Sequence, residues 1–146
     1  MLSKSLVIFI GIGVISGFVF GIYLIDSKTS HQLVYVEGSS VSVVTEKSDF
    51  KKGEEVKIRI VNSGTIPLEF SDDSYLLRIT GLAGITIYEP SQKITTLEPG
   101  KEIEYVWNQI KINGDPALEG LYKISTKSNT FDGQKIEKSI TVNIWK

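Results

Sequence analysis

Residues 56–62 of the chain read VKIRIVN and alternate between apolar and polar side chains over their first five positions. Successive side chains of a β-strand point to opposite faces of the sheet, so Val56, Ile58 and Ile60 share one face. Lysine and arginine occupy the other face. The stretch therefore predicts a strand with one buried and one solvated face, which is typical of antiparallel sheets.

The same period of two recurs along the chain on both sides of this strand. The stretches that show it are 33–35, 41–45, 77–79, 85–87, 103–107, 121–125 and 140–144. Turn-forming residues separate them at 52–53, 62–64, 81–84, 99–100, 113–116 and 132–133. No helical periodicity follows residue 30. The pattern predicts an all-β domain, an immunoglobulin-like β-sandwich of about eight or nine strands, with an up-and-down barrel as the alternative fold.

Length and composition limit the functions that the chain can have. Its 146 residues are enough for one ordinary domain, and its net charge of −1 gives no basic excess for binding nucleic acid. There is no cysteine and one histidine, His31, which lies outside the expected domain body. These counts exclude disulfides, thiolate zinc sites and blue-copper sites, and they disfavour a Ser-His-Asp triad. We expect no cofactor and no enzymatic activity.

An uncharged hydrophobic stretch of 20 residues covers positions 6–25. As a helix it would be about 30 Å long, which matches the hydrocarbon thickness of a membrane. Lys4 precedes it, and positive charge favours the cytoplasmic side. A cleaved signal peptide is the alternative, but the stretch is longer than a signal core and lacks a small-x-small cleavage site. We expect a cytoplasmic N-terminus at 1–5, a transmembrane helix at 6–25, a linker at 26–32 and an extracellular sandwich at 33–146.

Three glycines within this stretch, Gly13, Gly17 and Gly21, recur every four residues. On a helix they form one smooth face where a second helix can approach closely. Glycine is also common in transmembrane helices without such a role. The three residues are therefore a candidate packing face, with a second copy of the chain or another membrane subunit as the partner.

Several short motifs occur in a characteristic order in the expected sandwich, at 56–64, 67–71, 75–79, 84–88, 97–100, 107 and 120–122. This order resembles the intracellular proteinase inhibitor domain called BsuPI, an immunoglobulin-like sandwich. In that order, the stretches are similar to the family's strand ending in N-x-G, its L-x-F-S segment, the two strands of its apolar hairpin, its L-x-P-G turn, its tryptophan and its closing G-x-Y strand.

The resemblance implies an immunoglobulin-like fold and raises protease inhibition as an alternative function. The chain departs from the family pattern in two places. It carries an anchor, and Asp72-Asp73-Ser74 stands where the family often has a Gly-Gln pair. Because anchored modules of this look are typical of archaeal envelopes, the resemblance also implies an archaeal source.

The conspicuous residues of these motifs have structural roles as their simplest explanation. The Pro-Gly pair at 99–100 predicts a tight turn in which glycine supplies a positive φ. Trp107 and Tyr122 are expected in the core, with the indole N–H and the hydroxyl bonded to the backbone. Asn62 and Gly64 are expected to end a strand.

The stretch 108–119 is the candidate interaction loop, and its candidate contact residues are Asn113, Asp115, Pro116 and Glu119. An inhibitor needs an exposed and rigid loop, and proline stiffens this one. Contacts with a partner protein are expected at edge strands and at loops of the membrane-distal end.

Acidic side chains in three loops could supply oxygen ligands to calcium, namely Asp72, Asp73, Asp115, Glu119 and Asp132. No D-x-D-x-D-G array is present, and solvated loop charges are the simpler interpretation. We therefore expect no metal site.

Together these features predict a non-catalytic, membrane-anchored binding or structural module of the cell envelope. It would contact another protein, or serve as an accessory subunit of a membrane complex, as a homo- or hetero-oligomer through its helix. The alternative is a membrane-tethered protease inhibitor of the BsuPI type. We expect no contact with nucleic acid.

Overall fold

The computed structural model describes residues 33–71, 73–91 and 94–146. The expected anchor at 6–25 with Gly13, Gly17 and Gly21, the linker at 26–32, and Asp72 lie outside the described residues. In the part that is described, no helix is long and apolar enough to span a membrane.

The described part of the chain is all-β, as the sequence predicts. Its strands are β1 (Val41–Thr45), β2 (Asp49–Lys51), β3 (Val56–Asn62), β4 (Leu68–Glu69), β5 (Tyr75–Gly81), β6 (Thr86–Tyr88), β7 (Thr96–Leu97), β8 (Glu102–Trp107), β9 (Gly120–Asn129) and β10 (Lys135–Trp145). Four of these strands, β2, β4, β6 and β7, have only two or three residues each. The number of strands therefore exceeds the expected eight or nine through these short pieces.

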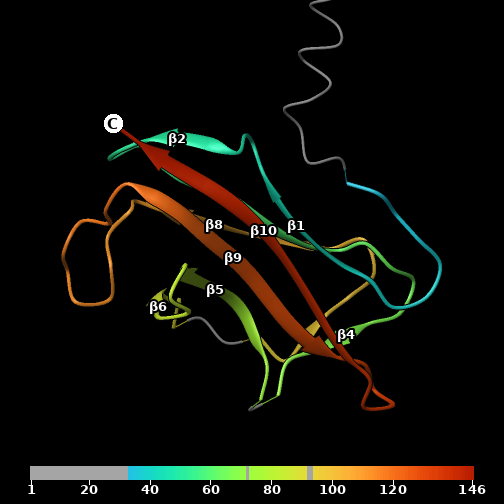
Figure 1. The fold of residues 1–146 in the computed structure, drawn as a ribbon. Coiled ribbons are helices and arrows are strands. Elements are labelled where there is room, and N and C mark those ends of the chain that lie inside the picture. Colours follow the sequence, from blue (N-terminus) through green and yellow to red (C-terminus); the bar gives the residue numbers. More distant parts are fainter. Residues whose placement is uncertain (1–32, 72, 92–93) are drawn as a thin grey trace, which may run out of the picture. The chain divides into compact units, whose positions relative to one another are not determined.

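The strands form two sheets. The smaller sheet has the order β1-β3-β8, and its neighbours are antiparallel. In the larger sheet β10 lies between β2 and β9, β9 pairs with β5, and β5 pairs with β6. The short strands β4 and β7 pair with each other beside β9. Figure 1 shows the two long strands, β9 and β10, side by side in the larger sheet.

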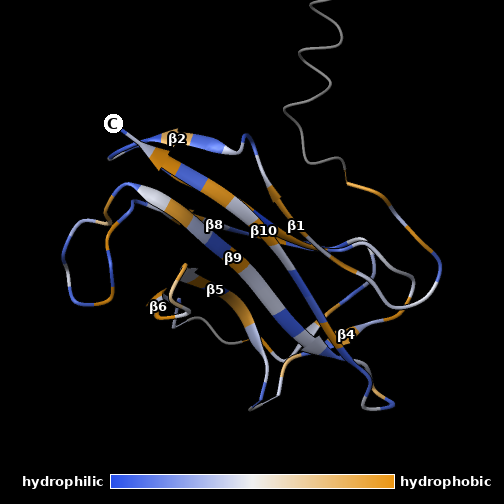
Figure 2. Cartoon of the chain, viewed as in Figure 1, coloured by the Kyte–Doolittle hydropathy of each residue, from blue (hydrophilic) through white to orange (hydrophobic). Residues whose placement is uncertain are grey.

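Buried side chains from both sheets form one hydrophobic core. Ile58 of β3, Trp107 of β8 and Ile124 of β9 are completely buried in it. In β10, Val142 and Ile144 are buried between more exposed neighbours. Figure 2 shows the matching alternation of hydrophobic (orange) and hydrophilic (blue) residues along this strand. The predicted inward faces of these strands are confirmed. Two sheets packed around one core are consistent with a β-sandwich.

One stretch of chain contributes to both sheets. β1 pairs antiparallel with β3 in the smaller sheet, and after a connection of three residues β2 pairs parallel with β10 in the larger sheet. Phe50 of β2 is buried in the core. The change of sheet closes one side of the core with a single stretch of chain.

Two predicted turns are confirmed. Gly100 has a φ of +72°, and the Lys101 N–H donates to the Glu98 carbonyl at 3.1 Å, which closes the turn between β7 and β8. Gly84 has a φ of +76°, and its N–H donates to the Gly81 carbonyl at 2.9 Å. This second turn joins β5 to β6. Glycine reaches these φ values without the strain that other residues incur.

The end of β3 joins segments that lie far apart in the sequence. Asn62 is completely buried, and its Nδ2 donates to the carbonyl oxygens of Ile66 at 2.9 Å and Leu97 at 2.8 Å. Its Oδ1 accepts the N–H of Gly64 at 3.1 Å. These bonds satisfy the buried amide and hold the end of β3 against β7. The expectation that Asn62 and Gly64 end a strand is confirmed.

Gly64 packs directly against the chain that leads into β1. A Cβ at this position would lie 2.2 Å from the Gly38 carbonyl oxygen and 2.6 Å from the Ser40 nitrogen. Both are backbone atoms, so neither can rotate out of the way. The Thr65 N–H donates to the same Gly38 carbonyl at 2.8 Å, which holds the two segments together.

The predicted first strand at 33–35 is wrong. Residues 33–36 belong to no strand, and the first strand begins at Val41. The apolar side chains of Val34, Tyr35 and Val36 remain exposed, because neither sheet covers them. The alternation that predicted a strand at 33–35 therefore belongs to an exposed apolar segment outside the core.

Replacing Gly64 by alanine tests the contact at the end of β3. Gly64→Ala is expected to lower the free energy of unfolding by about 1–3 kcal/mol, because the added methyl group overlaps backbone atoms. Gly81→Ala is the matched control, since a Cβ there meets nothing within 4 Å. Denaturant unfolding of both variants measures the difference, and equal stability would contradict the close approach at Gly64.

Candidate interaction surface

The loop between β8 and β9, residues 108–119, is a closed hairpin. Ile110 and Pro116 form an isolated β-bridge, and the Lys111 N–H donates to the Asp115 carbonyl at 2.8 Å. At the tip, the Gly114 N–H donates to the Lys111 carbonyl at 2.9 Å. Figure 1 shows the loop, in orange at the left, projecting from the start of β9. The predicted interaction loop is thus internally bonded along its length.

The structure brings three of the four predicted loop residues together. Asn113 Nδ2 donates to Asp115 Oδ2 at 2.7 Å, and the Asp115 N–H donates to Asn113 Oδ1 at 3.2 Å. Pro116 follows directly in the bridge. Glu119 makes a separate contact with Lys52, at 3.9 Å between Oε1 and Nζ. The polar side chains of the loop therefore brace its turn and its base.

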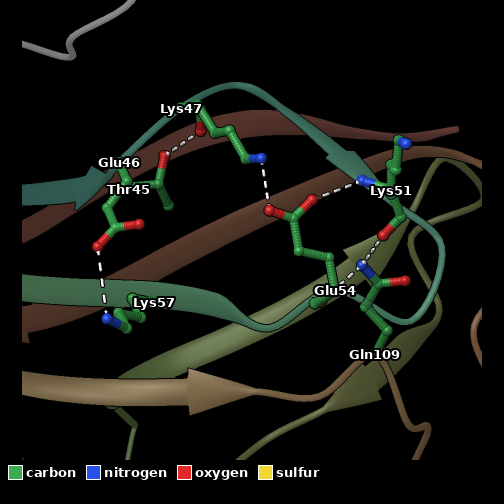
Figure 3. A network of polar contacts seen from close by, with 7 residues as sticks. All are labelled: Thr45, Glu46, Lys47, Lys51, Glu54, Lys57 and Gln109. Carbon is green, nitrogen blue, oxygen red and sulfur yellow. Dashed lines mark hydrogen bonds and ion pairs between the residues drawn. The ribbon is translucent and has the colours of Figure 1, made fainter.

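Gln109 fixes the base of the loop from a buried position. It is 2% exposed and has a φ of +59°. Its Nε2 donates to the carbonyl oxygens of Lys51 and Glu54, both at 2.8 Å, and its Oε1 accepts the Gly53 N–H at 2.8 Å. Figure 3 shows the carboxamide beside Lys51 and Glu54. A single polar residue after a strand has no periodicity, so the sequence offers no signal for this role.

The turn that receives Gln109 is braced by a surface carboxylate. Glu54 Oε1 lies 2.5 Å from Lys47 Nζ, and its Oε2 accepts the Lys51 N–H at 2.8 Å (Figure 3). The hydrogen bond from Lys47, followed by that from Lys51, lowers the pKa of Glu54 below its ordinary value of 4.5. Exposed ion pairs add little stability, so the main effect is to set the shape of the turn.

Two aromatic residues attach the loop to the core, and both are buried and bonded to the backbone as predicted. The indole N–H of Trp107 donates to the Ile110 carbonyl at 3.0 Å, and the Tyr122 hydroxyl donates to the Leu118 carbonyl at 2.5 Å. The two rings meet edge to face, with centroids 5.5 Å apart. Both ends of the loop are therefore bonded to buried side chains, which makes the loop rigid.

An apolar groove of about 610 Å³ lies between this loop and the turn that joins β5 to β6. Ile112 and Leu118 line it from the loop, and Leu82 and Ile85 line it from the turn. Each of these four side chains is at least 67% exposed. The Ile112 N–H donates to the Ile87 carbonyl at 2.8 Å, which ties the two walls together. Contiguous exposed apolar side chains of this kind mark contact surfaces.

Of the four predicted contact residues, only Asn113 lines the groove, and the apolar residues of the groove were not predicted. A weak signal existed in the sequence, because Leu82 stands in a Gly-x-x-Gly turn where polar residues are usual. Ile85 was expected inside a strand at 85–87. β6 begins one residue later, at Thr86, so Ile85 lies outside the strand and is exposed.

The acidic loop residues that the structure describes do not form a cluster able to hold a metal ion. Among the residues described, no group of three or more His, Cys, Asp or Glu side chains is placed to hold an ion. Asp73 Oδ2 lies 2.7 Å from Lys135 Nζ, and this bond, with those from Asn129 and Ser71, holds the pKa of Asp73 well below its usual range. Asp132 accepts a hydrogen bond from the Thr130 hydroxyl. Asp132 is thus bonded within its own turn, whereas Asp73 joins its loop to the end of β9 and the start of β10.

Comparisons with known proteins assign no family. No protein-family model matches the chain, and a comparison with curated proteins gives no match. Among solved structures, the sporulation control protein Spo0M of Bacillus subtilis matches with a TM-score of 0.43 and 16% identity. The match covers 76% of this chain and 51% of that one, so the chain spans about half the length of the structure it matches. A likeness of this size carries no argument about function.

Removing the Gln109 side chain tests how the loop is held. Gln109→Ala is expected to lower the free energy of unfolding by roughly 1–3 kcal/mol, because three part-buried hydrogen bonds to the backbone are lost. Amide hydrogen exchange at Gly53 and in 110–117 is expected to accelerate. Gln134→Ala, at an exposed position of the β9–β10 turn, is the control. Unchanged exchange in the loop would show that Gln109 does not hold it.

Proposed function

We propose that the chain is a non-catalytic binding module, anchored in the cell membrane, that contacts another protein of the envelope through the groove beside loop 108–119. The observation that carries this proposal is the groove itself. Leu82, Ile85, Ile112 and Leu118 are exposed side by side on two segments that the fold holds rigid. Such a patch is costly to leave in water, and a partner that buries it gains free energy from its apolar area.

We infer that the fold is immunoglobulin-like, and strand order supports this inference. β1, β3 and β8 correspond to strands A, B and E, and β10, β9, β5 and β6 correspond to G, F, C and C′. The bond from the Tyr122 hydroxyl to the Leu118 carbonyl, at the start of β9, has the form of a tyrosine corner. Such modules carry recognition on loops and exposed faces, which agrees with a binding role.

The apolar stretch at 6–25 supports a place in the membrane. It has the length and the absence of charge that a single span needs. Lys4 precedes the span, and the residues after it include 15 basic and 17 acidic side chains. By the positive-inside rule the short N-terminus would stay in the cytoplasm and the sandwich would face outward.

The lining of the groove sets the chemistry of the partner. Its lining is mainly aliphatic, and it also includes Tyr122 and the polar residues Thr86, Lys111 and Asn113. A partner segment that fits would present one or two bulky apolar side chains with a polar backbone beside them. Figure 1 shows the segment where the described chain begins, in blue, far from the orange loop, so residues 33–40 leave the groove open.

Charge placed in the groove tests this proposal. The tagged full-length chain is recovered from membranes in mild detergent, and the partner is identified and quantified by mass spectrometry. Leu82→Asp and Ile112→Asp are each expected to reduce partner recovery by about tenfold or more, because a carboxylate would be buried without a partner. Phe131→Asp is the control, since Phe131 is 76% exposed in the β9–β10 turn and does not line the groove. Unchanged recovery with both groove variants would exclude this surface.

Protease inhibition is the alternative function, and the rigidity of loop 108–119 favours it. An inhibitor loop has to enter an active-site cleft in a fixed conformation without being cut. The bridge between Ile110 and Pro116 and the bonds to Trp107 and Tyr122 supply such rigidity. The resemblance to the BsuPI domain is the second support.

Direct assays separate this alternative from the binding module. Under it, the purified chain abolishes the activity of one protease class at a stoichiometric ratio. Pro116→Gly is then expected to weaken inhibition about tenfold or more, because a loosened loop loses conformational entropy on binding. Asn129→Gly, at the end of β9, is a control outside the loop. If the chain leaves the activity of serine, cysteine, aspartic and metalloproteases unchanged, this function is excluded.

A further inference from the structure

Residues 33–36, LVYV, form an apolar segment that neither sheet uses. Val34 and Tyr35 are each 60% exposed, and Val36 is 45% exposed. The segment is nevertheless fixed to the domain, because the Val36 N–H donates to the Ser63 carbonyl at 2.9 Å. Two residues later, the Gly38 N–H donates to the Thr65 hydroxyl at 2.9 Å. Its apolar side chains are thus held in exposed positions by the fold.

A second groove, of about 600 Å³, runs beside this segment. Its walls are Val34 and Val36, strand β1, and residues 138–140 of β10. β1 is an edge of the smaller sheet in the described part of the chain, so one side of its backbone has no neighbouring strand there. Tyr35 does not line this groove, so its ring is available to another molecule.

The length of chain before this segment limits what can cover it. If the anchor ends at residue 25, the chain up to Val36 can extend over at most about 40 Å. Two anchors packed through Gly13, Gly17 and Gly21 would have axes about 8–10 Å apart. The segment 33–36 of one copy would therefore be within reach of the same region of a second copy.

We propose that this surface is an interface between two copies of the chain in the membrane. Tyr35 of each copy lies in the groove beside β1 of the other copy. A two-fold arrangement makes both contacts at once, because each copy offers a ring and a groove. An aromatic ring in an apolar groove is a frequent anchor of protein interfaces. This interface is separate from the groove at Leu82 and Ile112, so both can be occupied together.

Cross-linking in membranes tests the interface directly, and the absence of native cysteine makes the chain suited to it. Two differently tagged full-length copies are expressed together, one with Val34→Cys and the other with Ser139→Cys. Both positions line the groove of their own copy. Because the two thiols are on different copies, a disulfide or a short thiol cross-link between them can form only between chains.

The expected product carries both tags and has the mass of two chains. It is expected to be lost when Tyr35→Asp is added to both copies, because the ring that fills the groove is replaced by a charge. Ile112→Cys paired with Ser139→Cys is the matched control and is expected to give no product. The two cysteine positions that are compared, Val34 and Ile112, are exposed to similar degrees, 60% and 67%. Unchanged thermal unfolding of each variant confirms the fold.

Three results would overturn the proposal: no two-tag product although both thiols react with a maleimide, a product that survives Tyr35→Asp, or Ser139→Cys cross-linked to a different protein. Adding Leu82→Asp is expected to leave the product unchanged. The two-copy interface and the proposed contact at the other groove can therefore fail independently.

Discussion

The fold depends on a close approach that only glycine permits at position 64. The chain before β1 passes so near to Gly64 that a Cβ would meet the Gly38 carbonyl oxygen at 2.2 Å. Beside it, the backbone of Asn62 donates to the Lys101 carbonyl and accepts the Gly100 N–H, both at 2.9 Å. The end of the central strand β3 thus positions both of its neighbours, β1 and β8. A change at this corner would disturb the whole smaller sheet, because no other strand joins β1 to β8 in the described residues.

The loop that follows β8 is held in place by hydrogen bonds from buried side chains, and not by pairing with a further strand. Trp107 and Tyr122 lie in the core, and each makes one bond to the backbone of loop 108–119. Gln109 makes three more bonds to the turn after β2. A loop held in this way loses little conformational entropy when a partner binds, so a small apolar groove is enough to support a specific contact.

Much of the fold was predictable, because burial on one face forces a period of two. Strands β3, β8 and β10 follow that rule, and the Pro-Gly turn at 99–100 and the roles of Trp107 and Tyr122 have equally local causes. The candidate site was less predictable. Asn113, Asp115 and Pro116 do lie together, but the groove depends on which turn the loop meets. At 33–36 the sequence shows which side chains are apolar, but it does not show whether a sheet covers them, so the strand predicted at 33–35 was wrong.

The two apolar surfaces, one at each groove, are small, and confinement to a membrane would make such small contacts effective. The chain has no cysteine and one histidine, so it has few groups that titrate near neutral pH, and the proposed contacts rely on shape and apolar burial. If residues 6–25 anchor it, its partners are confined to the same surface, and confinement raises the effective concentration of each contact. Under that condition a segment of four apolar residues, too small to hold a dimer in solution, would add to a contact between two such anchors. Surfaces of modest size would then suffice, which would account for an LVYV segment that is exposed beside a well-buried core.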